Sequence, residues 1–271
     1  MSFSSKTPNR SEEKSRTTAS IEPANGVPVK AFAALVAIVL WQMAALALGR
    51  SLLLVSPLDV VIRLARLSST GSFWASVAFS FFRICLGFLA ALSAGMVLAF
   101  LAARVKTIEI MLWPYMAAVK ATPVASFIIL CLIWIGSGGL SVFISFLMVL
   151  PIIYTNVLQG LHSFDPKMEE MATLFGVTPL RRLYYFHIPQ IRPFLLSACG
   201  VAIGLSWKAG IAAEVIGIPS GSIGERLYEA KIYFSSADLF AWTAVVVLLS
   251  IGFEKMFVAL MKRSFDQMEK I

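Results

Sequence analysis

Residues 140–192 contain the alternation that decides the fold. An apolar block, LSVFISFLMVLPIIYTNVLQ (140–159), is followed by a polar stretch, LHSFDPKMEEMATLFGVTPLRRLYYFHIPQIR (161–192). A helix that crosses the hydrocarbon core of a bilayer needs about 20 mainly apolar residues. The block therefore predicts a membrane-spanning helix, and the polar stretch predicts a loop in water that follows it.

Similar apolar blocks recur along the chain, and we expect about six spans. Their approximate ranges are 31–48, 77–103, 122–135, 140–159, 193–216 and 238–260. Arg104, Lys106 and Glu109 indicate a polar loop. Pro114 and Pro123 interrupt the apolar block 111–135, because proline removes a backbone donor, and we expect a bent helix that leads into the third span. We also expect a short amphipathic helix at 60–67 and a tight turn at 136–139.

Composition supports a membrane protein. Hydrophobic residues make up 58% of the 271 residues and charged residues 14%, with a mean hydropathy of +0.81. A soluble domain has roughly 45–50% apolar and 25% charged residues. These values argue against a soluble enzyme, a disordered regulator and a disulfide scaffold, and the fold class we expect is an all-α membrane protein.

The blocks divide the chain into three parts. Residues 1–30 are polar and charged, which predicts a disordered tail, residues 31–262 form the membrane domain, and 263–271 are a second tail. A cleaved signal peptide ending near residue 47 is the alternative for the first span. The acidic residues in the leader disfavour that alternative.

The net charge of +8 predicts an orientation. With six spans, fourteen Lys and Arg residues fall on the side of both termini and of the 161–192 loop, and five fall on the other side. Because cytoplasmic loops are enriched in Lys and Arg, we place both termini in the cytoplasm. The excess of positive charge then needs no nucleic acid to explain it.

The chain shows no metal or catalytic motif. Its three cysteines lie inside apolar blocks, and its two histidines, His162 and His187, have no metal-ligand spacing. No GxxxxGK[ST] motif is present, since no glycine precedes a lysine, so we expect no phosphate loop and no cofactor. A membrane-embedded enzyme is therefore disfavoured.

The 161–192 loop predicts two short helices. Asp165-Pro166 is a helix start, Glu169 and Glu170 suit the positive end of the helix dipole, and Gly176 is a natural left-handed stop. Thr178-Pro179 repeats the start signal for a helix over 180–187 that ends before Pro189. The apolar faces of these helices fit either docking to a partner or folding back onto the membrane domain.

The stretch Glu170-Met171-Ala172, with Gly176 and Ile188-Pro189, resembles the EAA loop of permease subunits in bacterial ABC importers. Met171 replaces the middle alanine and Phe186 the usual isoleucine, and both keep an apolar face. The resemblance extends over residues 55–262, and Ser56-Pro57 and Thr122-Pro123 are similar to the nitrate, sulfonate and taurine branch. The coupling-loop residues it indicates are Glu169, Glu170, Ala172, Gly176, Arg181, Arg182, Ile188 and Pro189.

The resemblance implies a type I importer permease fold in the bacterial inner membrane. It also implies a second permease copy, a separate ATPase subunit that binds ATP, and an extracytoplasmic solute-binding protein. The chain itself is then expected to be non-catalytic and to transport a small solute, which the sequence does not identify. The alternative is a self-contained secondary transporter, which would normally show two related halves.

Charged residues inside the spans are the other functional candidates, because burying charge in lipid is expensive. Lys120 precedes the break at Thr122-Pro123, and Lys208 and Glu214 lie in the fifth span on different faces. Lining of a solute pathway and structural pairing are both open for these residues. The two lysines would suit an anionic solute.

Overall fold

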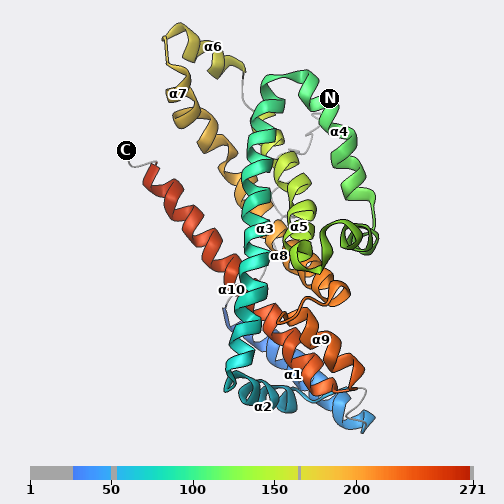
Figure 1. Ribbon diagram of the computed structural model, residues 1–271. Helices are drawn as coiled ribbons and strands as arrows, with labels where there is room; N and C mark the ends of the chain where they lie inside the picture. Colours follow the sequence, from blue (N-terminus) through green and yellow to red (C-terminus); the bar gives the residue numbers. More distant parts are fainter. Residues whose placement is uncertain (1–26, 50–53, 164–165, 269–271) are drawn as a thin grey trace, which may run out of the picture. The chain divides into compact units, whose positions relative to one another are not determined.

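The computed structural model describes residues 27–49, 54–163 and 166–268 of the chain (Figure 1), which is helical throughout its regular elements. It consists of two units, residues 1–49 and 50–271. In the first unit, α1 (Val27–Leu48) is apolar on all sides, as expected for a helix in lipid. The predicted disordered tail lies mostly outside the described residues, and α1 begins four residues before the predicted span.

In the second unit, α2 (Pro57–Ser68) matches the predicted amphipathic helix. The Ser56 hydroxyl caps it by accepting the Asp59 N–H at 3.1 Å, and Pro57 occupies the first turn, where no N–H is needed. The next helix, α3 (Gly71–Arg104), runs from α2 to the turn that leads into the following helix (Figure 1). Gly87 lets α3 approach the following long helix closely, because a Cβ there would lie 2.4 Å from the Val142 carbonyl oxygen.

Two predictions for the next segment were wrong in detail. Only Val105 separates α3 from α4 (Lys106–Ala121), so the expected polar loop is the first turn of a helix. The expected turn at 136–139 is a kink at Gly136, with φ of 71°, inside α5 (Val124–His162). The predicted third and fourth spans, 122–135 and 140–159, therefore lie mainly in this one helix, and residues 124–135 alone form a helical segment too short to cross a bilayer.

The polar loop contains α6 (Pro166–Leu174) and α7 (Pro179–Arg182). The predicted end of the second loop helix before Pro189 was wrong. A π-helical turn (Leu183–His187) joins α7 to α8 (Ile188–Gly217), and the helix continues through Pro189 and Pro193. The wider turn with an altered hydrogen-bond pattern accommodates residues that lack a backbone N–H.

The last two helices are α9 (Ile223–Ile232) and α10 (Ser236–Met268). Helix α9 lies in a stretch, residues 217–237, that is rich in Gly, Ser and charge, and no helix was predicted there. Five described helices are long and apolar enough to span a membrane: α1, α3, α5, α8 with the π-helical turn, and α10. The core of the second unit forms where α3, α5, α8 and α10 pack, with Trp207 and Phe88 fully buried there.

Candidate functional site

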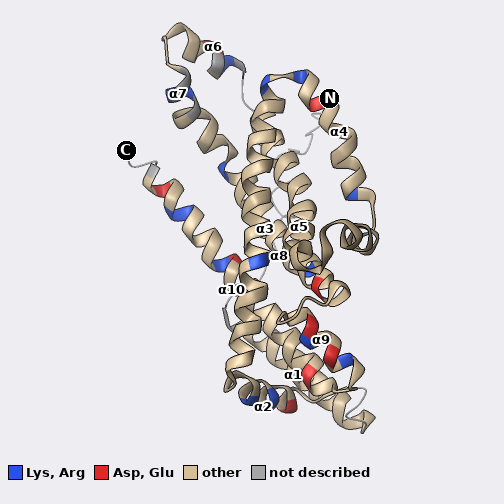
Figure 2. Cartoon of the chain, viewed as in Figure 1, with Lys and Arg blue, Asp and Glu red and all other residues tan. Residues whose placement is uncertain are grey.

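The two ends of the second unit differ in charge. The turn between α3 and α4, the α6–α7 loop and the C-terminal half of α10 point toward one end, while α2 and α9 lie toward the other (Figure 1). Figure 2 shows the distribution of charge over these elements. Eight described Lys and Arg residues belong to the loop end and four to the opposite end: Arg104, Lys106, Lys167, Arg181, Arg182, Arg192, Lys262 and Arg263 against Arg63, Arg66, Arg226 and Lys231.

At the loop end, α6 closes with a Schellman motif centred on Gly176. Gly176 has φ of 64°, its N–H donates to the Thr173 carbonyl at 3.1 Å, and the Val177 N–H donates to the Ala172 carbonyl at 2.9 Å. These two bonds satisfy carbonyls that the end of a helix would leave unpaired. The left-handed stop predicted at Gly176 is therefore present, and it fixes the direction in which the chain leaves α6.

The end of α6 presents apolar side chains to the outside. Leu174 is 86% exposed and Phe175 is 79% exposed, while Ala172 is 2% exposed. Lipid explains exposed apolar residues on the long helices, but these two lie beyond them, on the polar loop. An exposed apolar pair on a capped helix is typical of a surface that a partner covers.

The second loop segment is fastened to the first. The Arg182 guanidinium donates from Nε to the Val177 carbonyl at 2.9 Å, which joins the start of the second segment to the end of the first. The other sequence-predicted residues are placed as follows: Glu170, Arg181 and Pro189 are exposed, Arg182 and Ile188 are partly buried, and the side chain of Glu169 is outside the description.

The two lysines predicted inside the spans are both exposed on this chain. Lys120 lies in the last turn of α4 and donates to the Thr155 hydroxyl of α5 at 3.3 Å. Lys208 lies in the middle of α8, among buried residues of the same helix. The structure does not bring these two side chains into a common hydrogen bond or ion pair within its described part.

Glu214, in contrast, is fully buried. Its Oε2 accepts the Ser80 hydroxyl of α3 at 2.6 Å and the Gly224 N–H of α9 at 3.2 Å, and Ser80 in turn accepts the Ile223 N–H at 2.9 Å. The carboxylate and the Ser80 hydroxyl thus accept hydrogen bonds from the first N–H groups of α9. Negative charge is favourable at this end of a helix. This arrangement favours the structural alternative for Glu214.

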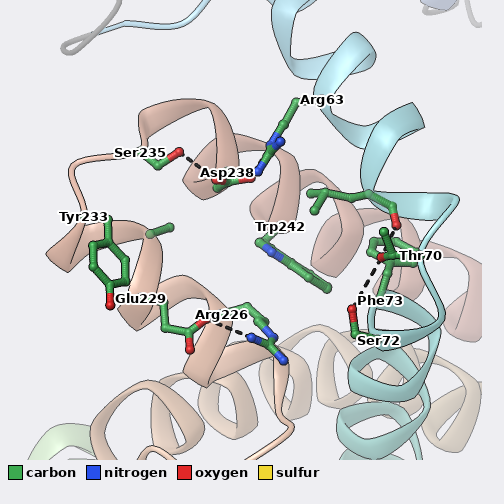
Figure 3. A pocket seen from close by; sticks show the side chains of 12 residues that line it. Arg63, Thr70, Ser72, Phe73, Arg226, Glu229, Tyr233, Ser235, Asp238 and Trp242 are labelled. Atoms are coloured by element: carbon green, nitrogen blue, oxygen red, sulfur yellow. Dashed lines mark hydrogen bonds and ion pairs between the residues drawn. The ribbon is translucent and has the colours of Figure 1, made fainter.

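At the opposite end, α2, α9 and α10 surround a cavity of about 220 Å³ (Figure 3). Its floor contains Phe73 stacked on Trp242, with ring centroids 5.0 Å apart. Arg63 of α2 reaches Asp238 of α10 with two hydrogen bonds, at 2.5 Å from Nε and 3.0 Å from Nη2. The hydrogen bond and the charge of Asp238 raise the pKa of the Arg63 guanidinium above its ordinary value.

Neither this cavity nor the cap of α9 was predicted from the sequence. One signal was available for α9, because Ser222 and Glu225 have the spacing of a capping box: Ser222 accepts the Glu225 N–H at 2.9 Å. The pairing of Arg63 with Asp238, separated by 175 positions, had no local signal. Among the described residues, no group of three or more His, Cys, Asp or Glu side chains could hold a metal ion.

Comparison with known proteins shows which class of membrane protein this chain belongs to. The family described as binding-protein-dependent transport system inner membrane component matches residues 91–264, a range that includes the whole polar loop. The chain belongs to this family. The importer permease is thus helical and membrane-embedded, as the resemblance implied, and the alternative of a self-contained secondary transporter is set aside.

Individual relatives agree with the family. The permease is 24% identical to the taurine transport system permease protein TauC of Escherichia coli, over 82% of this chain and 83% of the relative. It is 25% identical to the formylaminopyrimidine transport permease protein ThiX of Halalkalibacterium halodurans, over 80% and 86%. It is 26% identical to the riboflavin transport system permease protein RibX of Chloroflexus aurantiacus, over 84% and 85%. Permeases of ABC importers work with an ATPase and a binding protein, which implies both partners here.

Proposed function

We propose that this permease couples to its ATPase subunit through the 161–192 loop, and we call Met171, Leu174 and Phe175 the docking ridge. The observation that carries the proposal is the exposure of Leu174 and Phe175 at the end of a helix closed by a Schellman motif. Transferring two such side chains from water into a partner's cleft is favourable by roughly 1.5–3 kcal/mol each when they become fully buried.

The loop can transmit a movement to the membrane domain because its second segment is continuous with a membrane-spanning helix. From Pro179 to Gly217 the chain is helical without a break, through α7, the π-helical turn and α8. The Arg182 bond to Val177 ties the end of α6 to this continuous helix. A displacement of the docking ridge by the ATPase is thus passed to α8, the helix that contains Lys208 and Glu214.

The solute pathway in this proposal forms between two copies of the permease. Lys120 and Lys208 are its lining candidates, because both are cations on apolar helices and both are exposed on the single chain. Exposed cations at membrane depth are stable only where protein or water surrounds them. They favour a small solute that carries an anionic group, and the sulfonate of taurine, for which one relative is named, is such a group.

The proposed location is the bacterial inner membrane, with both termini in the cytoplasm. The excess of Lys and Arg at the loop end supports this orientation. The loop then meets the ATPase, which binds ATP, and the binding protein docks at the end formed by α2 and α9. The permease itself is non-catalytic and holds no cofactor.

Co-purification with the ATPase tests the docking ridge. The variant Leu174→Ser/Phe175→Ser should insert normally but lose the ATPase during purification. The matched control is Phe234→Ser, which changes an aromatic side chain of similar exposure, 78%, at the other end of the unit. Equal retention of the ATPase by the double variant and the control would refute the assignment of the loop.

A further inference from the structure

An apolar groove of about 540 Å³ lies between α3, α5, α8 and α10 in the half of the unit nearest the coupling loop. Its walls include Met96 and Phe100 of α3, Ile191 and Leu195 of α8, and Phe257 and Met261 of α10. Ser264 is the one lining residue with a polar side chain, and its hydroxyl donates to the Leu260 carbonyl at 3.1 Å. Leu260, also in the wall, is 54% exposed, so the groove opens to the surface of this unit.

Such a groove needs an apolar occupant. Water in it would find almost no hydrogen-bond partners, because the walls are aliphatic and aromatic and their one hydroxyl is already engaged. In a membrane protein, the apolar material that reaches an opening between helices is lipid or another helix. The physical question is which of the two fits the size and the charge of the groove.

Size favours a lipid chain. One turn of α-helix is about 5.4 Å long and about 10 Å wide with its side chains, or roughly 400 Å³ as a cylinder. The groove therefore has room for little more than one turn, which is too short for a stable helix–helix contact. An acyl chain is narrower and flexible, and it follows a groove of this volume without displacing the walls.

Charge favours an anionic headgroup. The Arg192 guanidinium lies 5.7 Å from the ring centroid of Phe265, a lining residue, and its Nη2 is 2.5 Å from Asp266 Oδ1 of α10. Lys262 and Arg263 follow Met261 on the same helix and are exposed. Three cations and one carboxylate therefore stand beside the loop end of the groove, which leaves it net positive.

We propose that this groove holds an acyl chain of an anionic phospholipid whose headgroup binds the cations Arg192, Lys262 and Arg263. The proposal goes beyond the transport function and does not depend on the docking ridge. Basic sites between membrane helices at the cytoplasmic side are known to favour anionic headgroups. In the orientation given above, the lipid belongs to the cytoplasmic leaflet.

The test uses the full chain purified in detergent and titrated with dioleoyl phosphatidylglycerol or dioleoyl phosphatidylcholine. Native mass spectrometry counts the retained lipids, and the thermal midpoint is read in parallel. Leu260→Trp fills part of the groove, and its control is Leu248→Trp, another exposed leucine of α10, 62% exposed, outside the groove. Lys262→Gln/Arg263→Gln removes two cations, and its control is Lys255→Gln on the same helix.

We expect the wild-type chain and both controls to retain phosphatidylglycerol in preference to phosphatidylcholine. Leu260→Trp should lose one bound molecule of either lipid, and the double charge variant should bind phosphatidylglycerol roughly thirtyfold more weakly. If Leu260→Trp does not fold, the charge variant decides alone. Equal retention of the two lipids by the wild-type chain, or no difference between the charge variant and its control, would overturn the proposal, while the coupling assignment would stand.

Discussion

The Glu214 carboxylate of α8 accepts a 2.6 Å hydrogen bond from the Ser80 hydroxyl of α3, and the pair serves the first N–H groups of α9. One buried acid thus joins α3, α8 and α9 at the end of the unit opposite the 161–192 loop. These hydrogen bonds give a structural reason for a costly charged residue inside a span.

Removing the acceptor at Glu214 should destabilise the permease. Glu214→Ala leaves the Gly224 N–H buried without a partner and opens a cavity, so we expect a loss of roughly 1–3 kcal/mol in the free energy of unfolding. Glu214→Gln keeps an acceptor oxygen for Ser80 and Gly224 and should lose much less. Thermal unfolding of the detergent-purified chain measures both, and equal losses would show that the hydrogen bonds are not the cause.

Gly224 should not tolerate a side chain. A Cβ at this position would lie 2.2 Å from Glu214 Cβ, so Gly224→Ala must push α9 away from α8. The control is Gly204→Ala in α8, where no atom lies within 4 Å, and where alanine should be neutral or stabilising by up to about 1 kcal/mol. Lower thermal midpoints are expected for Gly224→Ala alone. If both variants unfold at the wild-type temperature, α9 is not packed as described.

The left-handed conformation of Gly176 predicts a defect in coupling. Gly176→Val places a β-branched residue at φ of 64°, which costs roughly 1 kcal/mol or more. Because the strain falls on the cap of α6, membrane insertion should be normal while ATP-dependent uptake falls. Gly176→Asn should be milder, since asparagine tolerates this conformation better. Wild-type uptake by the valine variant would argue against a rigid cap.

The cations on the proposed pathway predict a change in transport without a change in stability. Lys208→Met removes the charge from an exposed position on α8, so uptake of an anionic solute should fall while the thermal midpoint stays near the wild-type value. Lys208→Arg keeps the charge and should retain more uptake. The measurement is ATP-dependent uptake into proteoliposomes that also contain the ATPase and the binding protein. Unchanged uptake by Lys208→Met would remove this lysine from the pathway.

The sequence predicted those features that depend on local chemistry. The short amphipathic helix that became α2, the stop at Gly176 and the apolar lengths of α3, α8 and α10 all follow from residues within a turn or a span of each other. The family could also be predicted from the sequence, because the residues that carry the resemblance, from Glu170 to Pro189, all belong to one loop. These features involve short stretches whose own hydrogen bonding and hydrophobicity decide the outcome.

The remaining features depend on contacts between distant segments. The π-helical turn before Pro189 carries the helix past a residue that locally favours an end. Glu214 was left between two roles because its partners Ser80 and Gly224 come from other helices. Arg63 likewise finds Asp238 only once α2 and α10 are packed together. No single-segment pattern contains that information.

Cross-linking of the docking ridge to the ATPase tests the central claim most directly. A cysteine introduced as Leu174→Cys in the assembled transporter and labelled with benzophenone maleimide should, on illumination, join the permease to the ATPase through a C–H bond of the ATPase, because Leu174 is 86% exposed on the loop. The three native cysteines are buried and should not react with the maleimide. The control is Phe234→Cys at the other end of the unit. The account predicts a permease–ATPase product for Leu174→Cys alone; its absence there, or an equal product from Phe234→Cys, would contradict it.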